Sequence, residues 1–152
     1  MAALLVSFEP FTGHHIIEIV AIEQQMYPDY PLSYGDLISH LGKGARGWVI
    51  KSGGKIIAYA LVAINDQKAH MLKLSVVSEY RNKGLGKKLL DRIVGLAQQQ
   101  GAKELRLEVA ETNTTAIRFY ERQGLSRQGV LSGYYPTQGE SVGGLLLSKD
   151  IA

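Results

Sequence analysis

The chain has 152 residues, a length typical of one ordinary domain, so we expect a single domain over residues 1–152. Apolar residues make up 45% and charged residues 20%, which excludes a disordered or low-complexity chain. The net charge of +3 suits an anionic small ligand and is too small to indicate nucleic-acid binding. The absence of cysteine excludes disulfides, thiolate metal sites and cysteine nucleophiles.

No apolar run approaches the roughly 20 residues that a membrane span requires, so we expect no membrane partner. The start of the sequence lacks a basic leader and meets an acidic residue at Glu9, so it does not resemble a signal peptide. These two features together predict a cytoplasmic protein.

The first third of the chain predicts a strand followed by two helices. Residues 3–8 predict a short strand, and isoleucines at helical spacing predict a helix from Thr12 to Met26. An aromatic loop with two prolines covers residues 27–32. A short helix from Tyr34 to Leu41 follows, ended by a glycine.

The middle of the chain predicts three strands. Residues 46–51 and 55–64 form a hairpin pattern across a Ser-Gly-Gly turn, and residues 70–77 predict the next strand. In that strand, strict alternation predicts one face from Leu72, Leu74 and Val76 and the other from the residues between them.

The last part of the chain predicts two helices among strands. A basic, glycine-bearing loop over residues 78–86 leads into a helix from Leu85 to Gln100. A strand over residues 103–109 precedes a helix from Asn113 to Arg122, and strands at 125–131 and 144–149 follow. This order predicts one α/β sheet with helices on both faces.

The loop before the long helix is the most informative segment of the sequence. It contributes two glycines and three cations and lies at a helix start, where free N–H groups favour an anion; it comprises Arg81, Asn82, Lys83, Gly84, Leu85, Gly86 and Lys87. A P-loop requires Gly-Lys-Ser/Thr, but here Lys88 follows Gly86-Lys87. A dinucleotide-binding motif requires a third glycine where Leu89 stands, so neither nucleotide-binding motif is present. A phosphate cradle and a plain basic turn stay open on these residues alone.

This segment resembles the Gln/Arg-x-x-Gly-x-Gly/Ala motif of the GNAT superfamily of acyl-CoA N-acyltransferases. The resemblance extends through a Leu-Glu-Val strand at 107–109 and through the Asn-x-x-Ala-x-x-Phe-Tyr-Glu pattern at 113–121. Within the superfamily the chain resembles ribosomal-protein-alanine N-acetyltransferases, which also have a Tyr-Tyr pair like Tyr134-Tyr135. Position for position, the resemblance covers residues 46–135 well.

The resemblance implies a mostly antiparallel, mixed sheet that splays at the cofactor site, between the strands at 70–77 and 103–109. It also implies acetyl-CoA as the acetyl donor, with pantetheine held by the backbone of Leu74, Ser75 and Val76. The pyrophosphate corresponds to Asn82 through Lys87, with Arg81 at the first position of the motif. Asn113 corresponds to the family's asparagine beside the cofactor.

The resemblance further implies Glu108 as general base and Tyr120 as general acid. A protonated amine must lose a proton before it attacks, and a carboxylate can accept this proton if burial raises its pKa or water connects it to the amine. From the residues alone, Glu108 also fits the polar face of a half-exposed strand, Tyr120 a helix core, and Asn113 a helix N-cap.

Three departures from the family pattern fall on the side of the acceptor. Val77-Ser78 replaces an Asp/His-Pro pair, the acidic pair after Tyr134-Tyr135 is reduced to Glu140, and the loop with Pro28 and Pro31 lacks a tryptophan. These departures bear on the acceptor more than on the chemistry.

The spacing of the four histidines does not indicate a metal site, so we expect no metal and assign each histidine a structural or solvated role. The sequence has neither a nucleophile elbow nor a cysteine to carry an acyl group, so direct attack by the amine is the simpler mechanism.

Three functions stay open at this point. The first is acetylation of a protein N-terminus, such as that of a ribosomal protein. The second is acetylation of a small amine, such as a polyamine, aminoglycoside or amino acid. The third is an inactive CoA-binding regulatory module. Either a monomer or a homodimer is compatible with the sequence.

Overall fold

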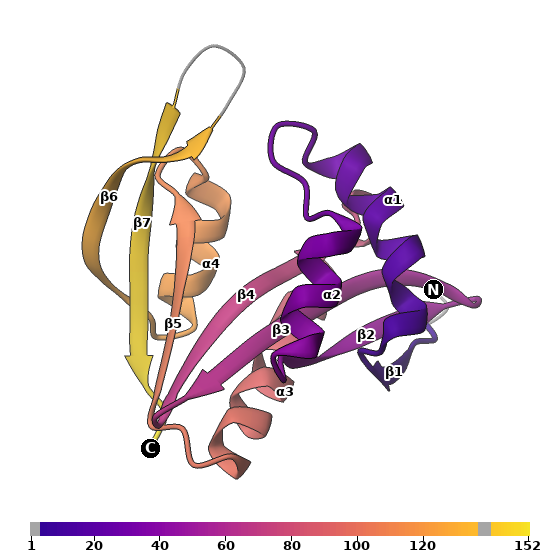
Figure 1. The fold of residues 1–152 in the computed structure, drawn as a ribbon, viewed down its shortest axis with the longest axis horizontal. Helices are drawn as coiled ribbons and strands as arrows, with labels where there is room; N and C mark the ends of the chain where they lie inside the picture. The colour runs from indigo at the N-terminus through magenta and orange to yellow at the C-terminus, as the bar shows by residue number, and fades with distance from the viewer. Residues whose placement is uncertain (1–3, 137–140) are drawn as a thin grey trace.

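The fold is a single seven-stranded sheet with helices on both faces, seen in a computed structural model that describes residues 4–136 and 141–152 (Figure 1). The strands are β1 (Ser7–Pro10), β2 (Arg46–Ser52), β3 (Lys55–Asn65), β4 (Lys68–Val76), β5 (Glu104–Ala110), β6 (Ser126–Pro136) and β7 (Ser141–Asp150). The helices are α1 (Ile16–Met26), α2 (Tyr34–Gly42), α3 (Leu85–Gln99) and α4 (Thr114–Arg122), with short 3-10 turns η1 (Gly13–His15) and η2 (Ser78–Tyr80). The predicted order of strands and helices is confirmed.

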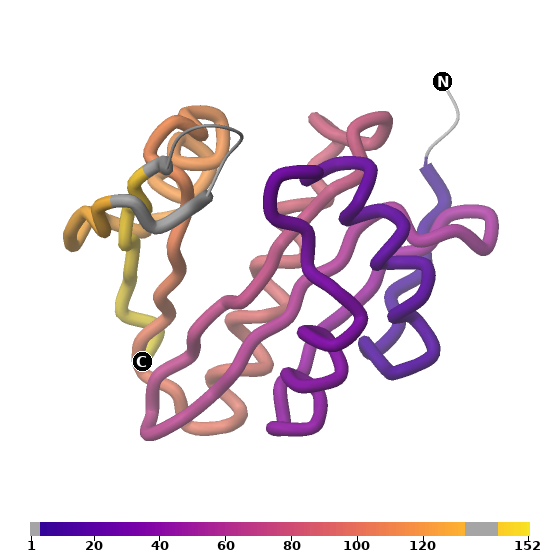
Figure 2. Tube along the Cα trace, turned by 45° about the horizontal axis from the view of Figure 1, so that its top comes forward, coloured from indigo at the N-terminus to yellow at the C-terminus, as the bar shows by residue number. Residues whose placement is uncertain are grey.

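The sheet consists of two limbs that meet at one narrow seam. Its strand order is β1-β2-β3-β4-β5-β7-β6, and every neighbouring pair is antiparallel except β4 and β5. Those two pair in parallel over only three positions, from Lys68 opposite Glu104 to His70 opposite Arg106. Beyond this seam the two limbs diverge, as Figures 1 and 2 show. The predicted mixed sheet, with its split between these strands, is confirmed.

Two apolar cores cover the two faces of the sheet. Helices α1 and α2 pack on one face, where Ile16, Ile19 and Leu37 are buried against residues of β2 and β3. Helices α3 and α4 contribute to the core on the other face, together with the inward side chains of β5. The helical spacing of the apolar residues of α3 therefore predicted its buried stripe correctly.

Strand β1 differs from its predicted position. We expected a strand over residues 3–8, and the structure places it at Ser7–Pro10, paired with β2 from Lys51 to Trp48. Strand β2 ends one residue later, at Ser52, so the residues before Ser7 have little of β2 left to pair with. The partner strand, rather than the local apolar pattern, sets where β1 begins.

Strand β4 does not follow the strict alternation that its sequence predicts. Met71 pairs with Val62 and Lys73 pairs with Leu61, so Leu72 is an extra residue at a bulge. Leu72 consequently packs in the α1–α2 core, whereas Leu74 packs in the core on the opposite face. The expectation that Leu72 and Leu74 share a face is wrong, because alternation fails wherever a bulge adds a residue.

No helix in the described ranges is long and apolar enough to cross a membrane.

Candidate active site

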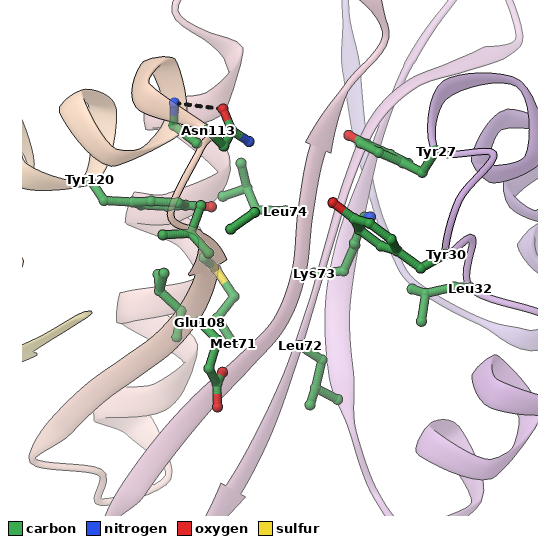
Figure 3. Close-up of a pocket in the computed structure, with 14 residues that line it drawn as sticks. Tyr27, Tyr30, Leu32, Met71, Leu72, Lys73, Leu74, Glu108, Asn113 and Tyr120 are labelled. Atoms are coloured by element: carbon green, nitrogen blue, oxygen red, sulfur yellow. Dashed lines mark hydrogen bonds between the residues drawn. The ribbon is translucent and has the colours of Figure 1, made fainter. Parts of the chain in front are cut away.

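A cavity of about 240 Å³ lies where the two limbs separate. Its walls come from the loop after α1, from β4, from β5 and from α4 with its cap, and the residues are Tyr27, Tyr30, Leu32, Met71, Leu72, Lys73, Leu74, Leu107, Glu108, Val109, Ala110, Asn113, Ala116 and Tyr120. Figure 3 shows Tyr27 and Tyr30 on one side of the cavity and Tyr120 on the other, with Leu74 between them. Both predicted catalytic residues therefore line one cavity.

The edge of β4 beyond the seam faces this opening. Val77 donates its amide to the Ile57 carbonyl at 2.9 Å, and the pairing with β3 continues in register from Val76 back to Lys73. Backbone groups alternate between the two edges of a strand, so Leu74 and Val76 direct their N–H and C=O groups away from β3. These are two of the three residues expected to bind pantetheine through the backbone.

The third of these residues, Ser75, is engaged elsewhere. Its backbone faces β3 by the same alternation, and its buried hydroxyl lies 2.6 Å from the Tyr27 hydroxyl. Ser75 therefore joins β4 to the loop after α1, and Leu74 and Val76 are better oriented toward the opening.

The predicted phosphate cradle is an exposed loop leading into α3. Asn82 and Gly84 have φ values of 62° and 78°, a left-handed conformation that glycine adopts without strain. Gly84 is the N-cap of α3, and the first turn of the helix contains no acidic residue. The first amides of an α-helix have no acceptor within the helix, and the helix dipole favours an anion there. The loop thus has the backbone and charge that a pyrophosphate requires.

The side chains of the cradle have different roles. Leu85 is buried in the core, so only its backbone is available to a ligand. The Arg81 Nε donates to the Val76 carbonyl at 3.2 Å, and Lys87 forms an exposed ion pair with Asp91 at 2.9 Å. Lys83 is exposed.

Gly86 lies against a side chain of α4. A Cβ at this position would meet the ring of Phe119 at 3.4 Å, a close but ordinary van der Waals contact. The first turn of α3 therefore lies directly against α4, which carries Tyr120. The second motif glycine brings the helix with the predicted acid close to the cradle.

Glu108 lies on β5 and its carboxylate is held by a histidine. The His70 Nε2 is 2.6 Å from the Glu108 Oε2, and the side chains are 32% and 16% exposed. In Figure 3 the Glu108 carboxylate lies on the far side of Met71 from the Tyr120 hydroxyl. The two predicted catalytic groups therefore occupy different parts of the cavity.

Tyr120 and Asn113 are both presented by α4. The Tyr120 side chain is 7% exposed, and its hydroxyl points into the cavity toward Leu74 (Figure 3). The Asn113 Oδ1 accepts the Ala116 amide at 3.2 Å, which makes Asn113 the N-cap of α4. The N-cap interpretation of Asn113 is confirmed, and its position in the cavity wall leaves it available to a cofactor as well.

A buried carboxylate, Glu23, organises the opposite wall. It is completely buried, and it accepts the Leu32 amide at 2.9 Å, the Tyr59 hydroxyl and an ion pair from the Lys73 Nζ at 3.2 Å. The Lys73 Nζ also lies 3.6 Å from the centre of the Tyr27 ring. This set of residues, which we call the Glu23 cluster, fastens the loop after α1 to β3 and β4.

Burial shifts the pKa values of the groups around Glu23. Desolvation lowers the pKa of the Lys73 ammonium, against the attraction of the Glu23 carboxylate. Desolvation raises the pKa of the Tyr59 phenol, and the adjacent carboxylate adds to this shift. The pKa of Tyr27 is also raised by burial. Both phenols therefore stay neutral hydrogen-bond donors at neutral pH.

The sequence and the structure also match known proteins. Residues 14–125 match the Acetyltransferase (GNAT) family. The chain belongs to the GNAT acetyltransferase family. It is accordingly an N-acetyltransferase by family, and acetyl transfer is the reaction that its relatives perform.

Two curated relatives illustrate the range of the match. The [Ribosomal protein bS18]-alanine N-acetyltransferase of Escherichia coli (strain K12) is 29% identical over 76% of this chain and 78% of its own length. N-alpha-acetyltransferase 60 of Danio rerio is 36% identical over 62% of this chain and 40% of its own length.

Solved structures support the fold. The ribosomal-protein-S18-alanine N-acetyltransferase from Escherichia coli superposes with a TM-score of 0.89 at 24% identity, over 97% of this chain and 95% of that chain. Ard1 from Thermoplasma volcanium gives a TM-score of 0.86 at 20% identity, over 97% and 98% of the two chains.

Two features of the candidate site were not predicted from the sequence. We assigned His70 a structural or solvated role, and the structure places its ring against Glu108. The Glu23 cluster was also missed, although a glutamate within an apolar helical stripe was a signal for it. The side chains of Tyr134-Tyr135, and Glu140 entirely, lie outside the described part of the chain.

A second histidine group lies away from the cavity. The carboxylate of Glu9 and the rings of His14 and His15 come within 4.8 Å of one another. The His15 Nδ1 accepts the Thr12 amide at 3.0 Å, so the hydrogen of the neutral ring is on Nε2, which faces Glu9 at 3.5 Å. This tautomer has no lone pair on Nε2 for a metal ion.

Proposed function

We propose that this chain acetylates the N-terminal α-amine of a protein, with acetyl-CoA as the donor and by direct attack of the amine. The observation that carries the proposal is the opening between β4 and β5, which has a strand edge on one side and Glu108 and Tyr120 on the other. The cytoplasmic location and the single-domain organisation expected for this chain remain predictions.

The residues of the chain fit the donor. Leu74 offers its backbone N–H and C=O, and Val76 its N–H, along the edge of β4 that faces away from β3. The start of α3 offers amides and positive charge for a pyrophosphate. Acetyl-CoA supplies a thioester whose carbonyl carbon accepts an amine. We assign the Val76 N–H, which faces the opening, the task of polarising that carbonyl as negative charge develops on its oxygen.

The acid and base act on opposite sides of the transfer. A bond forms between the amine nitrogen and the acetyl carbon, and the bond from that carbon to sulfur breaks. We assign Glu108 to accept the proton that the amine loses, and Tyr120 to donate a proton to the leaving sulfur. The separation of the two groups in Figure 3 suits this division of roles, and it favours water between Glu108 and the amine.

The charge of the cavity supports an N-terminal acceptor over a polycation. Of the described residues that line it, Lys73 is the only basic one and Glu108 the only acidic one. A polyamine or aminoglycoside brings several cations, and this wall offers them one carboxylate, which the proposed chemistry already uses. Tyr27 and Tyr30 instead contribute rings and hydroxyls, and Leu32 an apolar side chain, which suit a peptide with a small first residue.

Release of CoA from acetyl-CoA tests this proposal. We expect faster turnover on a peptide with an N-terminal alanine than on spermidine, an aminoglycoside or free alanine. The same peptide with a blocked N-terminus and an internal lysine is the matched control, and it should give background turnover. Turnover confined to a small amine would discard the N-terminal acceptor, and binding of acetyl-CoA without any turnover would favour a regulatory module.

A further inference from the structure

The hydrogen bond between His70 and Glu108 crosses the seam at the point where it opens. His70 occupies the last paired position of β4, opposite Arg106, and Glu108 lies two residues further along β5, where the strands have separated. The Nε2 and Oε2 atoms are 2.6 Å apart. This is therefore a side-chain contact between the two limbs at the base of the cavity.

The proposed role of Glu108 sets the direction of this bond. A general base must be ionised, and an ionised carboxylate only accepts, so in that role the hydrogen lies on the His70 Nε2. A bond to an ionised acceptor is stronger than one between neutral groups, and its short length agrees with this. It occupies one carboxylate oxygen of Glu108 and leaves the second to accept a proton.

The two residues have different access to the cavity. Glu108 is part of the cavity wall and His70 is not, among the residues that the structure describes. Register and alternation put further charged residues on the same sheet face near His70, and these are Lys68 on β4, Glu104 and Arg106 on β5, and Asp150 on β7. The described part of the chain shows no hydrogen bond or ion pair between any of them and the Glu108 carboxylate, so His70 is the described partner that orients it.

We propose that His70 is a positioning residue that holds the Glu108 carboxylate in the orientation needed to receive the amine proton. This inference rests on the proposed function of Glu108. A glutamate side chain has several rotatable bonds, and a displacement of about 1 Å in a catalytic group can cost about 100-fold in rate. The hydrogen bond that His70 donates removes that freedom without placing His70 against the amine substrate.

A pair of substitutions at His70 tests the inference. His70→Gln keeps an N–H donor of similar reach, and His70→Leu removes the donor at similar volume. We expect His70→Leu to lower kcat at least tenfold, with the KM for acetyl-CoA unchanged, and His70→Gln to restore kcat to within about threefold of the wild type. Equal kcat values in all three proteins would overturn the inference.

A role confined to joining the strands predicts another pattern. Both variants would then lose thermal stability and bind acetyl-CoA more weakly, while kcat at saturation stayed constant. Melting temperature and acetyl-CoA affinity are measured on the same samples, so a misfolded His70→Leu is recognised. The kcat of His70→Gln then distinguishes the two roles, because this variant keeps the hydrogen-bond donor while it removes the imidazole ring.

Nitrogen-15 NMR of the histidines tests the contact without any turnover. We expect the His70 Nε2 to carry a hydrogen, and its signal to shift in Glu108→Gln; His70→Gln identifies the signal. A bare Nε2 would overturn the inference even in an active enzyme. If the peptide is not acetylated but a small amine is, the kcat comparison is made with that amine, so a wrong acceptor and a wrong role for His70 give different results.

Discussion

Two glutamates lie on opposite sides of the cavity, Glu108 in its wall and Glu23 buried behind the other wall, and their surroundings differ. Glu23 is completely buried and accepts from a backbone amide, a tyrosine and a lysine. Glu108 is 16% exposed and has one described partner, His70. One carboxylate is therefore saturated with donors, and the other keeps capacity to exchange a proton.

This difference distinguishes a carboxylate that stabilises the fold from one that is proposed to take part in the reaction. A buried charge is tolerated only when its partners are complete, and any proton that it accepted would break them. A carboxylate at the cavity surface with one free oxygen can change its protonation without disturbing the fold. We therefore expect changes at Glu23 to affect stability first, and changes at Glu108 to affect rate first.

Glu23→Gln should have the largest effect. The amide keeps an acceptor for Leu32 or Tyr59 but leaves the Lys73 ammonium without its counter-charge, and breaking a buried pair costs about 3 kcal/mol. We expect a loss of that size in the free energy of unfolding, measured by urea denaturation. Adding Lys73→Met to the Glu23→Gln protein should recover part of the loss. A Glu23→Gln protein as stable as the wild type would contradict the structural role assigned to Glu23.

Glu108→Gln should lower kcat by about 100-fold, because removing a general base typically costs at least that much. The melting temperature and the affinity for acetyl-CoA should stay near wild type. Glu104→Gln, on the same strand and face, is the matched control and should retain activity. A Glu108 variant with normal turnover would assign the base elsewhere.

Tyr120→Phe should lower kcat by about tenfold while leaving the ring in the core. The proton for the leaving sulfur must then come from water, which is less well positioned. Because a thiolate already leaves readily, we expect a smaller effect than at Glu108. Tyr34→Phe, at an exposed position, serves as the control. An effect larger than that of Glu108→Gln would reverse the proposed order of importance.

Gly84→Ala should have the smallest effect of these substitutions, and it should weaken only the binding of acetyl-CoA. Alanine at a φ of 78° is strained by about 1 kcal/mol, so the cradle should change shape. We expect weaker acetyl-CoA binding by about fivefold in calorimetry, with an unchanged KM for the acceptor. Gly53→Ala, also at positive φ but in the β2–β3 turn, controls for strain itself. Equal acetyl-CoA affinity in both variants and the wild type would show that the loop containing Gly84 does not bind the donor.

Local patterns predicted most of the fold. The buried face of β5, with Leu105, Leu107 and Val109, and the buried stripe of α3 reflect the two periodicities of burial, and the strand and helix predicted there are confirmed. The bulge at Leu72 escaped prediction, because it depends on how β3 and β4 pair and not on the residues of β4 alone.

A candidate site could be proposed from the sequence most directly where its residues are close together in the chain. The cradle from Arg81 to Lys87 is one segment, so its motif could be read directly. The contact between His70 and Glu108 joins residues 38 positions apart, and the Glu23 cluster draws on α1, β3 and β4. Such contacts are set by strand register and helix docking, for which a single sequence gives no spacing rule.

The bulge at Leu72 lies two residues after His70, the last residue of β4 that pairs with β5. A bulge bends its strand and increases the local twist, so this one residue turns β4 away from its neighbour. Deleting Leu72 should straighten β4 and let its pairing with β5 run on past His70. The width of the opening is thus encoded in the length of the chain, and a shortening by one codon would close it into a continuous sheet.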